Sequence, residues 1–290
     1  MQAYSVIIPH KNTPALLQRC LDSLASQPDM EIIVVDDNSS PDLVDFNHFP
    51  GSERADVQTV LTKEGRGAGY ARNVAMAIAR GRWLIFVDAD DMVTPEFSSL
   101  IASHRDDDVD MVLFKAASIV EQTGEPSNRH LHHNQAIEGA LKGQESERQA
   151  AIGVAAPWCR MIKRELVTKN NLRFDETMVA NDVMFISRCV CMADGFAFDP
   201  GVLYVITERR DSLITSHRVD ADRYMTRMEV CARANDLWRN HGLRRLPILR
   251  MVWQARRYGL LMKSLAFAIR KGIFFSGISN YGYLIKRKLQ

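Results

Sequence analysis

Short apolar runs alternate with helical patterns over the first 115 residues. Most of these runs are continuous and rich in β-branched or aromatic residues, which is typical of strands buried on both faces. The strands expected from these runs cover residues 5–8, 31–35, 57–61, 83–87 and 111–114, of which the third is the weakest. Strand–helix alternation of this kind predicts an α/β fold, a mostly parallel sheet with helices on both faces.

Apolar residues at three- and four-residue spacing predict helices between these strands. Helices are expected to start at residues 13–14 and 94–95, where threonine can cap the helix and proline fits its first turn. Another is expected over residues 70–80, with Gly81 ending it. Residues 120–150 are polar and lack periodicity, so we expect a loop there.

The C-terminal part is predicted to be helical and differs from the rest in charge. Residues 237–290 contain twelve Lys or Arg and no Asp or Glu, whereas residues 1–236 contain 25 basic and 35 acidic residues, a net charge of −10. Basic residues mixed with aromatics on helices are typical of segments that lie on an anionic membrane surface. Packing of these helices on protein is the alternative, and no motif indicates nucleic-acid binding.

Cysteine usage and hydropathy favour a cytoplasmic protein. The five cysteines are scattered and odd in number, which argues against a disulfide scaffold. The N-terminus lacks a charged leader, and no run of 18 apolar residues occurs.

Carboxylates follow two of the predicted strands. Residues 36–39 read Asp-Asp-Asn-Ser, and residues 88–91 read Asp-Ala-Asp-Asp. Because the carboxyl ends of parallel strands meet at one edge of a sheet, both clusters are expected to face one crevice. Clustered carboxylates suit Mn²⁺ or Mg²⁺, which are usually shared with phosphate oxygens.

Glycines and arginines at residues 65–73 lead into the second helix and favour a neighbouring diphosphate. The first strand ends in Pro-His-Lys-Asn without glycine, which excludes a Rossmann dinucleotide site, and no P-loop motif occurs. The same strand end also lacks the basic Gly-rich loop expected of a sugar nucleotidyltransferase, one of the alternatives considered.

In chain order these motifs resemble the signatures of family 2 glycosyltransferases, inverting enzymes with the GT-A fold. The match covers about residues 4–215, and its pieces are Ser5–Pro9, Val34–Ser39, Ala71–Asn73, Phe86–Asp91, Pro157–Glu165, Arg173–Asp175, Asn181–Phe185, Leu203–Tyr204 and Arg210–Leu213. The resemblance implies a catalytic domain over residues 1–215, with a nucleotide-sugar half to about residue 115 and an acceptor half beyond it. Residues 216–290 would be a helical basic extension.

The resemblance also implies roles for single residues. Asp36 would hold the nucleotide, most often uridine, and Asp88 would face the ribose or sugar. Asp90 would bind the metal, with Asp88 and His217 as further candidate ligands. The other residues implied on the donor side are Pro9, Asn12, Asp37, Arg66, Arg72 and Ala89.

The acceptor side departs from the family pattern. Asp182 matches the general base, the second member of a Glu-Asp pair, but the first member is Asn181 here. Because an amide cannot accept the proton, the base role is expected to fall wholly on Asp182. Trp158 is expected either to stack on an acceptor sugar or to fill the core. The first strand ends in His10-Lys11 where the family commonly has an aromatic residue before Asn12.

Simpler interpretations exist for several of these residues. Residues 36–39 could form a strand-to-loop cap, and Asp182 could be an ordinary acid at a helix start. His217 could supply a late metal ligand, but a surface histidine is the favoured interpretation. His130, His132 and His133 suggest a metal cluster, but their polar context favours a solvated loop.

The implied activity is metal-dependent transfer of a sugar, from UDP most often, to a hydroxyl of a glycan or lipid-linked acceptor. The implied setting is bacterial surface polysaccharide synthesis (capsule, O-antigen, lipopolysaccharide or exopolysaccharide), peripheral on the inner face of the cell membrane, with a homo-oligomer possible. A nucleotide-sugar-binding protein whose chemistry is lost at Asn181 is the alternative from another class.

Overall fold

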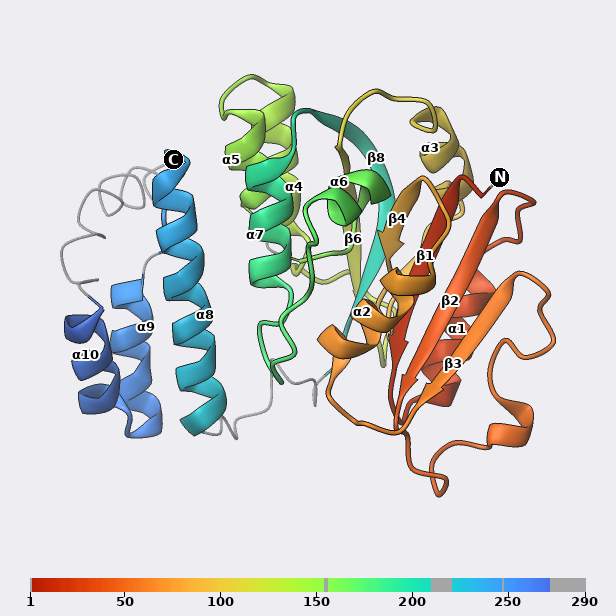
Figure 1. Cartoon of the computed structure of the whole chain (residues 1–290), viewed down its shortest axis with the longest axis horizontal. Helices are drawn as coiled ribbons and strands as arrows, with labels where there is room; N and C mark the ends of the chain where they lie inside the picture. Colours follow the sequence, from red (N-terminus) through yellow and green to blue (C-terminus); the bar gives the residue numbers. More distant parts are fainter. Residues whose placement is uncertain (1, 154–155, 210–220, 247, 272–290) are drawn as a thin grey trace. The chain divides into compact units, whose positions relative to one another are not determined.

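The computed structural model describes residues 2–153, 156–209, 221–246 and 248–271 (Figure 1). The chain divides into two compact units, residues 1–215 and residues 216–290. Each unit has a hydrophobic core of its own.

The first unit is built on one eight-stranded sheet with the order β3-β2-β1-β4-β7-β6-β8-β5. The strands are β1 (Tyr4–His10), β2 (Met30–Asp37), β3 (Val57–Thr62), β4 (Trp83–Phe86), β5 (Met92–Val93), β6 (Met111–Val120), β7 (Arg160–Lys163) and β8 (Phe196–Glu208). Strands β3, β2, β1 and β4 run parallel, as do β6 and β8. Antiparallel pairing is confined to β7 with its two neighbours and to β5 with β8. The α/β class and the mostly parallel sheet are confirmed.

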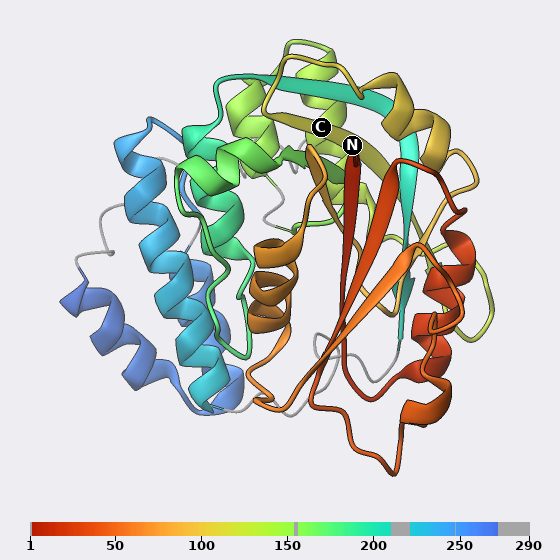
Figure 2. The same cartoon turned by 45° about the vertical axis from the view of Figure 1, so that its right-hand side comes forward.

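Helices cover both faces of this sheet. They are α1 (Pro14–Ser23), α2 (Ala68–Ile78), α3 (Phe97–Ser103), α4 (Leu131–Leu141), α5 (Glu147–Ile152), α6 (Arg164–Lys169) and α7 (Val183–Met192), with a short 3₁₀ turn η1 (Phe46–His48). Val6 and Ile8 of β1 pack with Leu17 of α1 in one core layer. Phe86 of β4 contacts Phe185 of α7, with ring centroids 5.7 Å apart. Figures 1 and 2 show α1 and α2 on opposite faces of the sheet.

One helix start is found without its expected cap, and two other predicted helix boundaries differ from the structure. Thr13 precedes α1 as expected, but its side chain donates to Lys11 O (3.4 Å) and does not cap the helix. Helix α3 begins at Phe97, later than predicted, because Thr94 Oγ1 instead donates to Val202 O (2.6 Å) and fastens this turn to β8. Helix α2 ends before Gly81, where a Cβ would lie 2.5 Å from Ser5 N. That glycine therefore serves close packing against β1.

The prediction of a loop over residues 120–150 is wrong. Strand β6 continues to Val120, and α4 and α5 occupy most of the segment. His133 on α4 is 2% exposed, and its Nε2 donates to Phe114 O at 2.6 Å. Burial lowers the pKa of His133 to about 4, so this ring is uncharged. The solvated-loop interpretation is wrong for His133 because the histidine satisfies a strand carbonyl inside the fold.

The second unit consists of α8 (Ala221–Asn240), α9 (Ile248–Gln254), the 3₁₀ turn η2 (Ala255–Tyr258) and α10 (Leu261–Arg270), as the helical pattern predicted. Its core includes Met228 of α8, Val252 of α9 and Phe267 of α10. Asn235 holds the α8–α9 connection, since its side chain bonds both N (2.6 Å) and O (3.0 Å) of Leu246. Within the described ranges, no helix has the length and apolarity needed to cross a bilayer.

All five cysteines lie in the described part of the chain, where they are free and buried. Cys20, Cys189, Cys191 and Cys231 lie on helices, and Cys159 directly precedes β7. No structural role of these cysteines depends on pairing.

Candidate active site

The ends of β1 and β2 lie side by side and bury the first acidic cluster. The register places His10 opposite Asp36, and His10 Nδ1 donates to Asp36 Oδ2 at 2.8 Å. Ser39 contributes its N–H (2.9 Å) and its hydroxyl (2.5 Å) to the same carboxylate, which is 1% exposed. Burial raises the pKa of Asp36, but the bonds from His10 and Ser39 outweigh it, so that the pKa lies below its ordinary value.

Asp37 holds the glycine-rich loop that precedes α2. Its carboxylate accepts hydrogen bonds from the backbone N–H groups of Arg66 (2.9 Å) and Gly67 (2.8 Å). These are the groups that the sequence suggested for a diphosphate, and in this structure Asp37 takes them. The Arg66 side chain is half exposed and forms an ion pair with Glu176.

Asn12 joins the loop after β1 to the loop after β2. Its backbone lies in the left-handed region (φ 60°), which asparagine tolerates better than most residues. Asn12 N–H donates to Ser39 Oγ (2.7 Å), and its side-chain oxygen accepts from Ser40 N–H (2.8 Å). Pro9, one residue before the end of β1, aligns with Val35 in the register with β2.

The second acidic cluster forms the connection from β4 to β5. Asp88 Oδ1 accepts from Arg72 Nη2 at 2.6 Å, and Asp90 Oδ2 accepts from Arg209 Nη2 at 2.5 Å. Both carboxylates are about one third exposed (31% and 34%), whereas Ala89 between them is buried. Burial raises the pKa of Asp90, and the neighbouring charge of Asp88 raises it further.

Asp91 points into the protein, and its partners come from β8. It accepts hydrogen bonds from Tyr204 Oη (2.8 Å) and Thr207 N–H (2.6 Å) and is 5% exposed. Burial, followed by the charges of Asp88 and Asp90, raises the pKa of Asp91 well above its ordinary value. Because β7 and β6 separate β4 from β8 in the sheet order, this contact shows that the sheet curls.

Arg72 joins the β4–β5 connection to the segment that precedes α7. Its Nη2 binds Asp88, and its Nη1 donates to Asn181 Oδ1 at 3.0 Å. The guanidinium is 7% exposed and lies over the ring of Phe174, 5.3 Å from the centroid. Three predicted site residues, Arg72, Asp88 and Asn181, therefore form one cluster.

Two residues of α2 hold residues 174–175 against this helix. Asn73 pairs with both backbone groups of Phe174, accepting from its N–H (2.9 Å) and donating to its O (3.0 Å). At Gly69 a Cβ would lie 2.1 Å from Asp175 O, so a glycine is needed for this approach.

Asp182 is the residue that precedes α7, so the predicted helix start is found. Its side chain does not cap the described first turn of α7. The fully buried guanidinium of Arg160 interacts with it electrostatically. Burial lowers the pKa of Arg160 to about 10, and Asp182 is among the groups that oppose this shift. Arg160 is therefore charged at neutral pH and favours the ionised form of Asp182.

Trp158 stacks on Tyr204, with ring centroids 5.6 Å apart and an interplanar angle of 11°. The ring of His133 also lies beside Trp158, with ring centroids 5.1 Å apart. The indole is part-buried against the sheet core, which fits the core alternative. Its role toward an acceptor stays a prediction.

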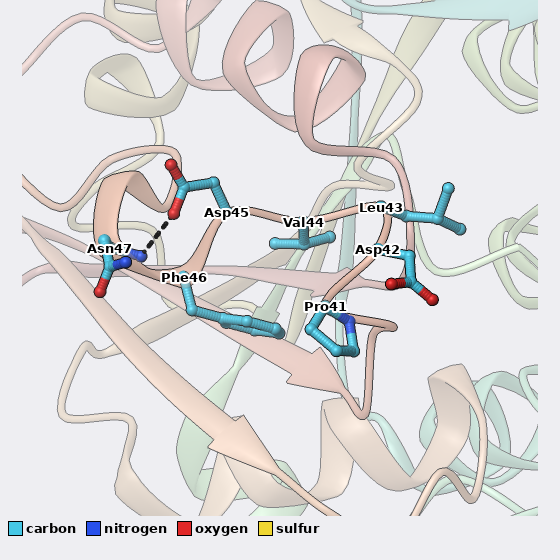
Figure 3. A pocket seen from close by; sticks show the side chains of 7 residues that line it. All are labelled: Pro41, Asp42, Leu43, Val44, Asp45, Phe46 and Asn47. Atoms are coloured by element: carbon cyan, nitrogen blue, oxygen red, sulfur yellow. Dashed lines mark hydrogen bonds between the residues drawn. The ribbon is translucent and has the colours of Figure 1, made fainter.

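Among the described residues, no group of three or more His, Cys, Asp or Glu side chains is placed to hold a metal ion. His217 lies outside the described residues. A cavity of about 470 Å³ lies on the segment after β2, lined by residues 41–47 (Figure 3). None of the predicted site residues lines it.

Sequence reasoning missed several residues that organise the site. Tyr204 lay within a recognised motif but had no role, and Asp91 was not separated from Asp88 and Asp90. His10 stood out as a departure from the family pattern, which was a usable signal. The structure explains this departure, since His10 is the partner of Asp36.

The sequence profile of Glycosyl transferase family 2 matches residues 5–170, more than half of the chain. The chain belongs to this family. The Escherichia coli K12 glycosyltransferase YibD is 26% identical over 220 residues, which cover 74% of this chain and 64% of that protein. The succinoglycan biosynthesis protein ExoU of Rhizobium meliloti is 25% identical over 223 residues, 73% of this chain and 64% of its own. The chain thus spans less than two thirds of the length of these relatives.

Solved structures confirm the fold. Staphylococcus aureus TarS residues 1–349, in complex with UDP-GlcNAc, superposes with a TM-score of 0.63 at 22% identity, covering 81% of this chain and 66% of that one. The mannosyltransferase PcManGT of Pyrobaculum calidifontis, in complex with GDP-Man and Mn²⁺, gives 0.53 at 17% identity, with coverages of 99% and 79%.

Proposed function

We propose that this chain transfers a sugar from a nucleotide donor, UDP in the first instance, to a hydroxyl of a glycan acceptor, with inversion. The observation that carries the proposal is the pair of bonds from Arg72 to Asp88 and Asn181. One guanidinium joins the acidic motif of the donor half to the residue beside the base. Relatives named for polysaccharide biosynthesis support surface polysaccharide synthesis as the setting.

The donor is proposed to lie along the carboxyl ends of β1, β2 and β4. Asp36 would orient the base, while Asp88 and Arg72 would face the sugar and the diphosphate. Arg66 would join them by exchanging Glu176, its present partner, for a phosphate oxygen. Such an exchange is inexpensive because the Arg66 side chain is 56% exposed.

The carboxylates of Asp88 and Asp90 fit a divalent cation. Two partly exposed oxygen ligands that repel one another match the way Mg²⁺ is held by one or two carboxylates, with phosphates and water completing the shell. When bound, such a cation supplies charge that stabilises the departing diphosphate. In this structure Arg209 Nη2 is bonded to Asp90 Oδ2. Binding of the cation through that oxygen would require this ion pair to open.

Asp182 is proposed as the general base. It would take the proton from the acceptor hydroxyl while that oxygen forms its bond to the anomeric carbon. The bond from the anomeric carbon to the diphosphate breaks on the opposite face, and the nucleoside diphosphate leaves. The buried charge of Arg160 keeps Asp182 ionised for this step. Trp158 and Asn181 are the proposed acceptor-side contacts.

Two amide substitutions test these roles. Asp182→Asn should lower acceptor-dependent turnover about 100-fold or more while donor affinity is unchanged.

Asp90→Asn should remove Mn²⁺-dependent donor hydrolysis without changing the fold. Asp108→Asn is the matched control because the side chain of Asp108 is fully exposed. Nucleotide release and thermal unfolding are measured for all three.

Normal transfer by Asp182→Asn would reject the base assignment. Full turnover in chelator would reject the metal. Tight nucleotide-sugar binding with no hydrolysis and no transfer by the natural sequence would instead support the non-catalytic binding protein.

A peripheral membrane location is proposed from the second unit. Residues 237–271 carry nine Lys or Arg and no acid. On α10, Met262 (74% exposed) and Ile269 (62%) lie seven residues apart on one face with exposed Ala266 between them, and Lys263 and Arg270 adjoin this face. Each basic residue near an anionic leaflet contributes about 1 kcal/mol, so a few of them suffice for reversible binding.

Vesicle sedimentation tests this location. The full chain should sediment with vesicles rich in phosphatidylserine and stay in solution with neutral vesicles or at high salt. Met262→Ser with Ile269→Ser should weaken sedimentation, whereas Leu43→Ser, at an exposed apolar residue of the first unit (57%), should not. Equal sedimentation of both variants would reject the surface, and a concentration-dependent mass would assign it to a second copy.

A further inference from the structure

Tyr204 of β8 connects both ends of the acidic motif with one hydroxyl. The Asp88 N–H donates to Tyr204 Oη at 3.0 Å, and Tyr204 Oη donates to Asp91 Oδ2 at 2.8 Å. The other oxygen of Asp91 accepts from Thr207 N–H at 2.6 Å. Tyr204 is 1% exposed, so water does not compete for these bonds.

The middle of the motif is fastened to the same strand. Arg19 of α1 donates through Nη2 to Asp90 O (2.7 Å) and to Thr207 Oγ1 (3.3 Å). The backbone of residues 88–91 is therefore held at its first, third and fourth residues. The carboxylates of Asp88 and Asp90 are the parts of the motif that remain partly exposed.

The motif needs such anchoring because its carboxylates repel one another. Asp88, Asp90 and Asp91 come from four consecutive residues of one connection, so their negative charges lie close together. A loop that joins a central strand to an edge strand would relax under this repulsion unless its backbone were fixed. Ligands of Mg²⁺ or Mn²⁺ must keep their spacing within about 0.5 Å.

We propose that Tyr204 and Asp91 are positioning residues, which set the spacing of the Asp88 and Asp90 carboxylates for a divalent cation. The inference rests on the proposed metal-dependent transfer. Tyr204 would act through the Asp88 backbone and through Asp91, whose two carboxylate oxygens already accept from Tyr204 Oη and Thr207 N–H. Its ring is held separately by the stack with Trp158.

Tyr204→Phe isolates the hydroxyl because the phenyl ring can keep its stack. Mn²⁺ affinity in the presence of UDP, measured from the electron paramagnetic resonance signal of free Mn²⁺, should fall about 10-fold, the usual effect of losing a partner behind a metal ligand. UDP affinity in chelator should be unchanged.

Tyr4→Phe is the matched control. Tyr4 is also 1% exposed, and its hydroxyl donates to Ile101 O at 3.1 Å, outside the acidic motif. Tyr204→Phe loses two buried hydrogen bonds and Tyr4→Phe loses one, so both should lose thermal stability, Tyr204→Phe the more. Mn²⁺ affinity should fall in Tyr204→Phe alone.

Unchanged Mn²⁺ affinity in Tyr204→Phe, with Mn²⁺ binding by the natural sequence, would overturn the inference and leave the proposed function standing. Failure of the natural sequence to bind Mn²⁺ with UDP would overturn both. If Tyr204→Phe does not fold, Asp91→Asn takes its place, since its amide cannot accept from both Tyr204 and Thr207. Its Mn²⁺ affinity should also fall, and natural affinity would overturn the inference.

Discussion

At the scale of single residues, the site depends on side chains that each hold two distant segments. Arg72 is the clearest case, since its two terminal nitrogens bind Asp88 and Asn181, which are 93 positions apart in the sequence. A planar guanidinium can hold both partners at fixed angles, which a lysine ammonium cannot.

Arg72→Lys should therefore lose one of the two bonds. A hydrogen bond to a charged group contributes about 1.5–3 kcal/mol, so kcat/KM for the donor should fall roughly 10- to 100-fold. Arg82→Lys is the control. Arg82 lies away from the site, where it donates to Asp107 O and forms an ion pair with the exposed carboxylate of Asp106. Steady-state nucleotide release measures both, and equal kcat/KM values would contradict the bridging role.

His104 gives the molecule a pH-dependent bond. Its Nδ1 lies 2.7 Å from Asp107 Oδ2 and its Nε2 lies 2.9 Å from Asp199 Oδ2. Burial opposes the charged ring, but the two carboxylates outweigh it and raise the pKa of His104. The stabilisation is therefore complete below the ordinary pKa near 6.5 and is lost as the pH rises through the raised value.

The difference in unfolding free energy between the natural sequence and His104→Asn should thus shrink as the pH rises above about 6.5. Urea titrations at several pH values measure it. A difference that grows with pH would reverse the sign and reject the charged pairing.

Several of these residue-level contacts could be predicted and others could not. The two acidic clusters follow strands, so their place at one sheet edge was readable from the sequence. The partners of Asp36 and Asp37 were not, because the register of β1 on β2 sets His10 opposite Asp36, and the Arg66 N–H comes from a loop whose path depends on the whole fold. Local sequence patterns indicate where strands end, but they do not indicate which residues of distant segments pair there.

At the scale of elements, α7 carries the proposed base at its start and is secured at its end by Arg148. The Arg148 guanidinium donates to Val190 O (2.7 Å), Cys191 O (2.6 Å) and Ala193 O (2.8 Å). These carbonyls belong to the last turn, where a helix leaves its acceptors unsatisfied and favours positive charge.

Arg148→Ala should lower the free energy of unfolding by about 2–3 kcal/mol, since three carbonyls lose a charged donor. Arg105→Ala should cost under about 1 kcal/mol, because Arg105 is half exposed and forms one surface ion pair with Asp29. Chemical denaturation measures both, and similar losses would show that Arg148 adds nothing beyond a surface charge.

The helix from which Arg148 comes was missed in the sequence. Helix α4 buries only His133 and Ile137 of its eleven residues, so it lacks an apolar stripe. Helix α5 has six residues, too few for periodicity, but Ser146 and Gln149 have capping-box spacing, and Ser146 accepts from Gln149 N–H. The strands with continuous apolar runs in the first 115 residues, by contrast, were found, because full burial leaves a clear pattern. The apolar run at residues 202–206 of β8 was not assigned to a strand.

At the scale of the whole molecule, each unit has its own core. Residues 1–215 contain the sheet with every described site residue, and residues 216–290 contain the basic helices. Domains with separate cores can fold alone.

A chain ending at residue 215 should therefore unfold cooperatively and bind UDP with the affinity of the full chain. It should lose sedimentation with anionic vesicles. Circular dichroism melting and calorimetric titration measure the first two properties. A truncated chain that melts without cooperativity would show that the first unit needs the second.

The burial of all five cysteines has a practical consequence for the chemistry of this protein. Burial raises the pKa of the thiols of Cys20, Cys159, Cys189 and Cys191, the last to about 11. Thiols without access or thiolate character react slowly with maleimides. A single cysteine introduced at an exposed residue such as Met262 would therefore be the fastest-labelled thiol on the native protein. A fluorophore attached there reports on its surroundings without removal of any natural cysteine.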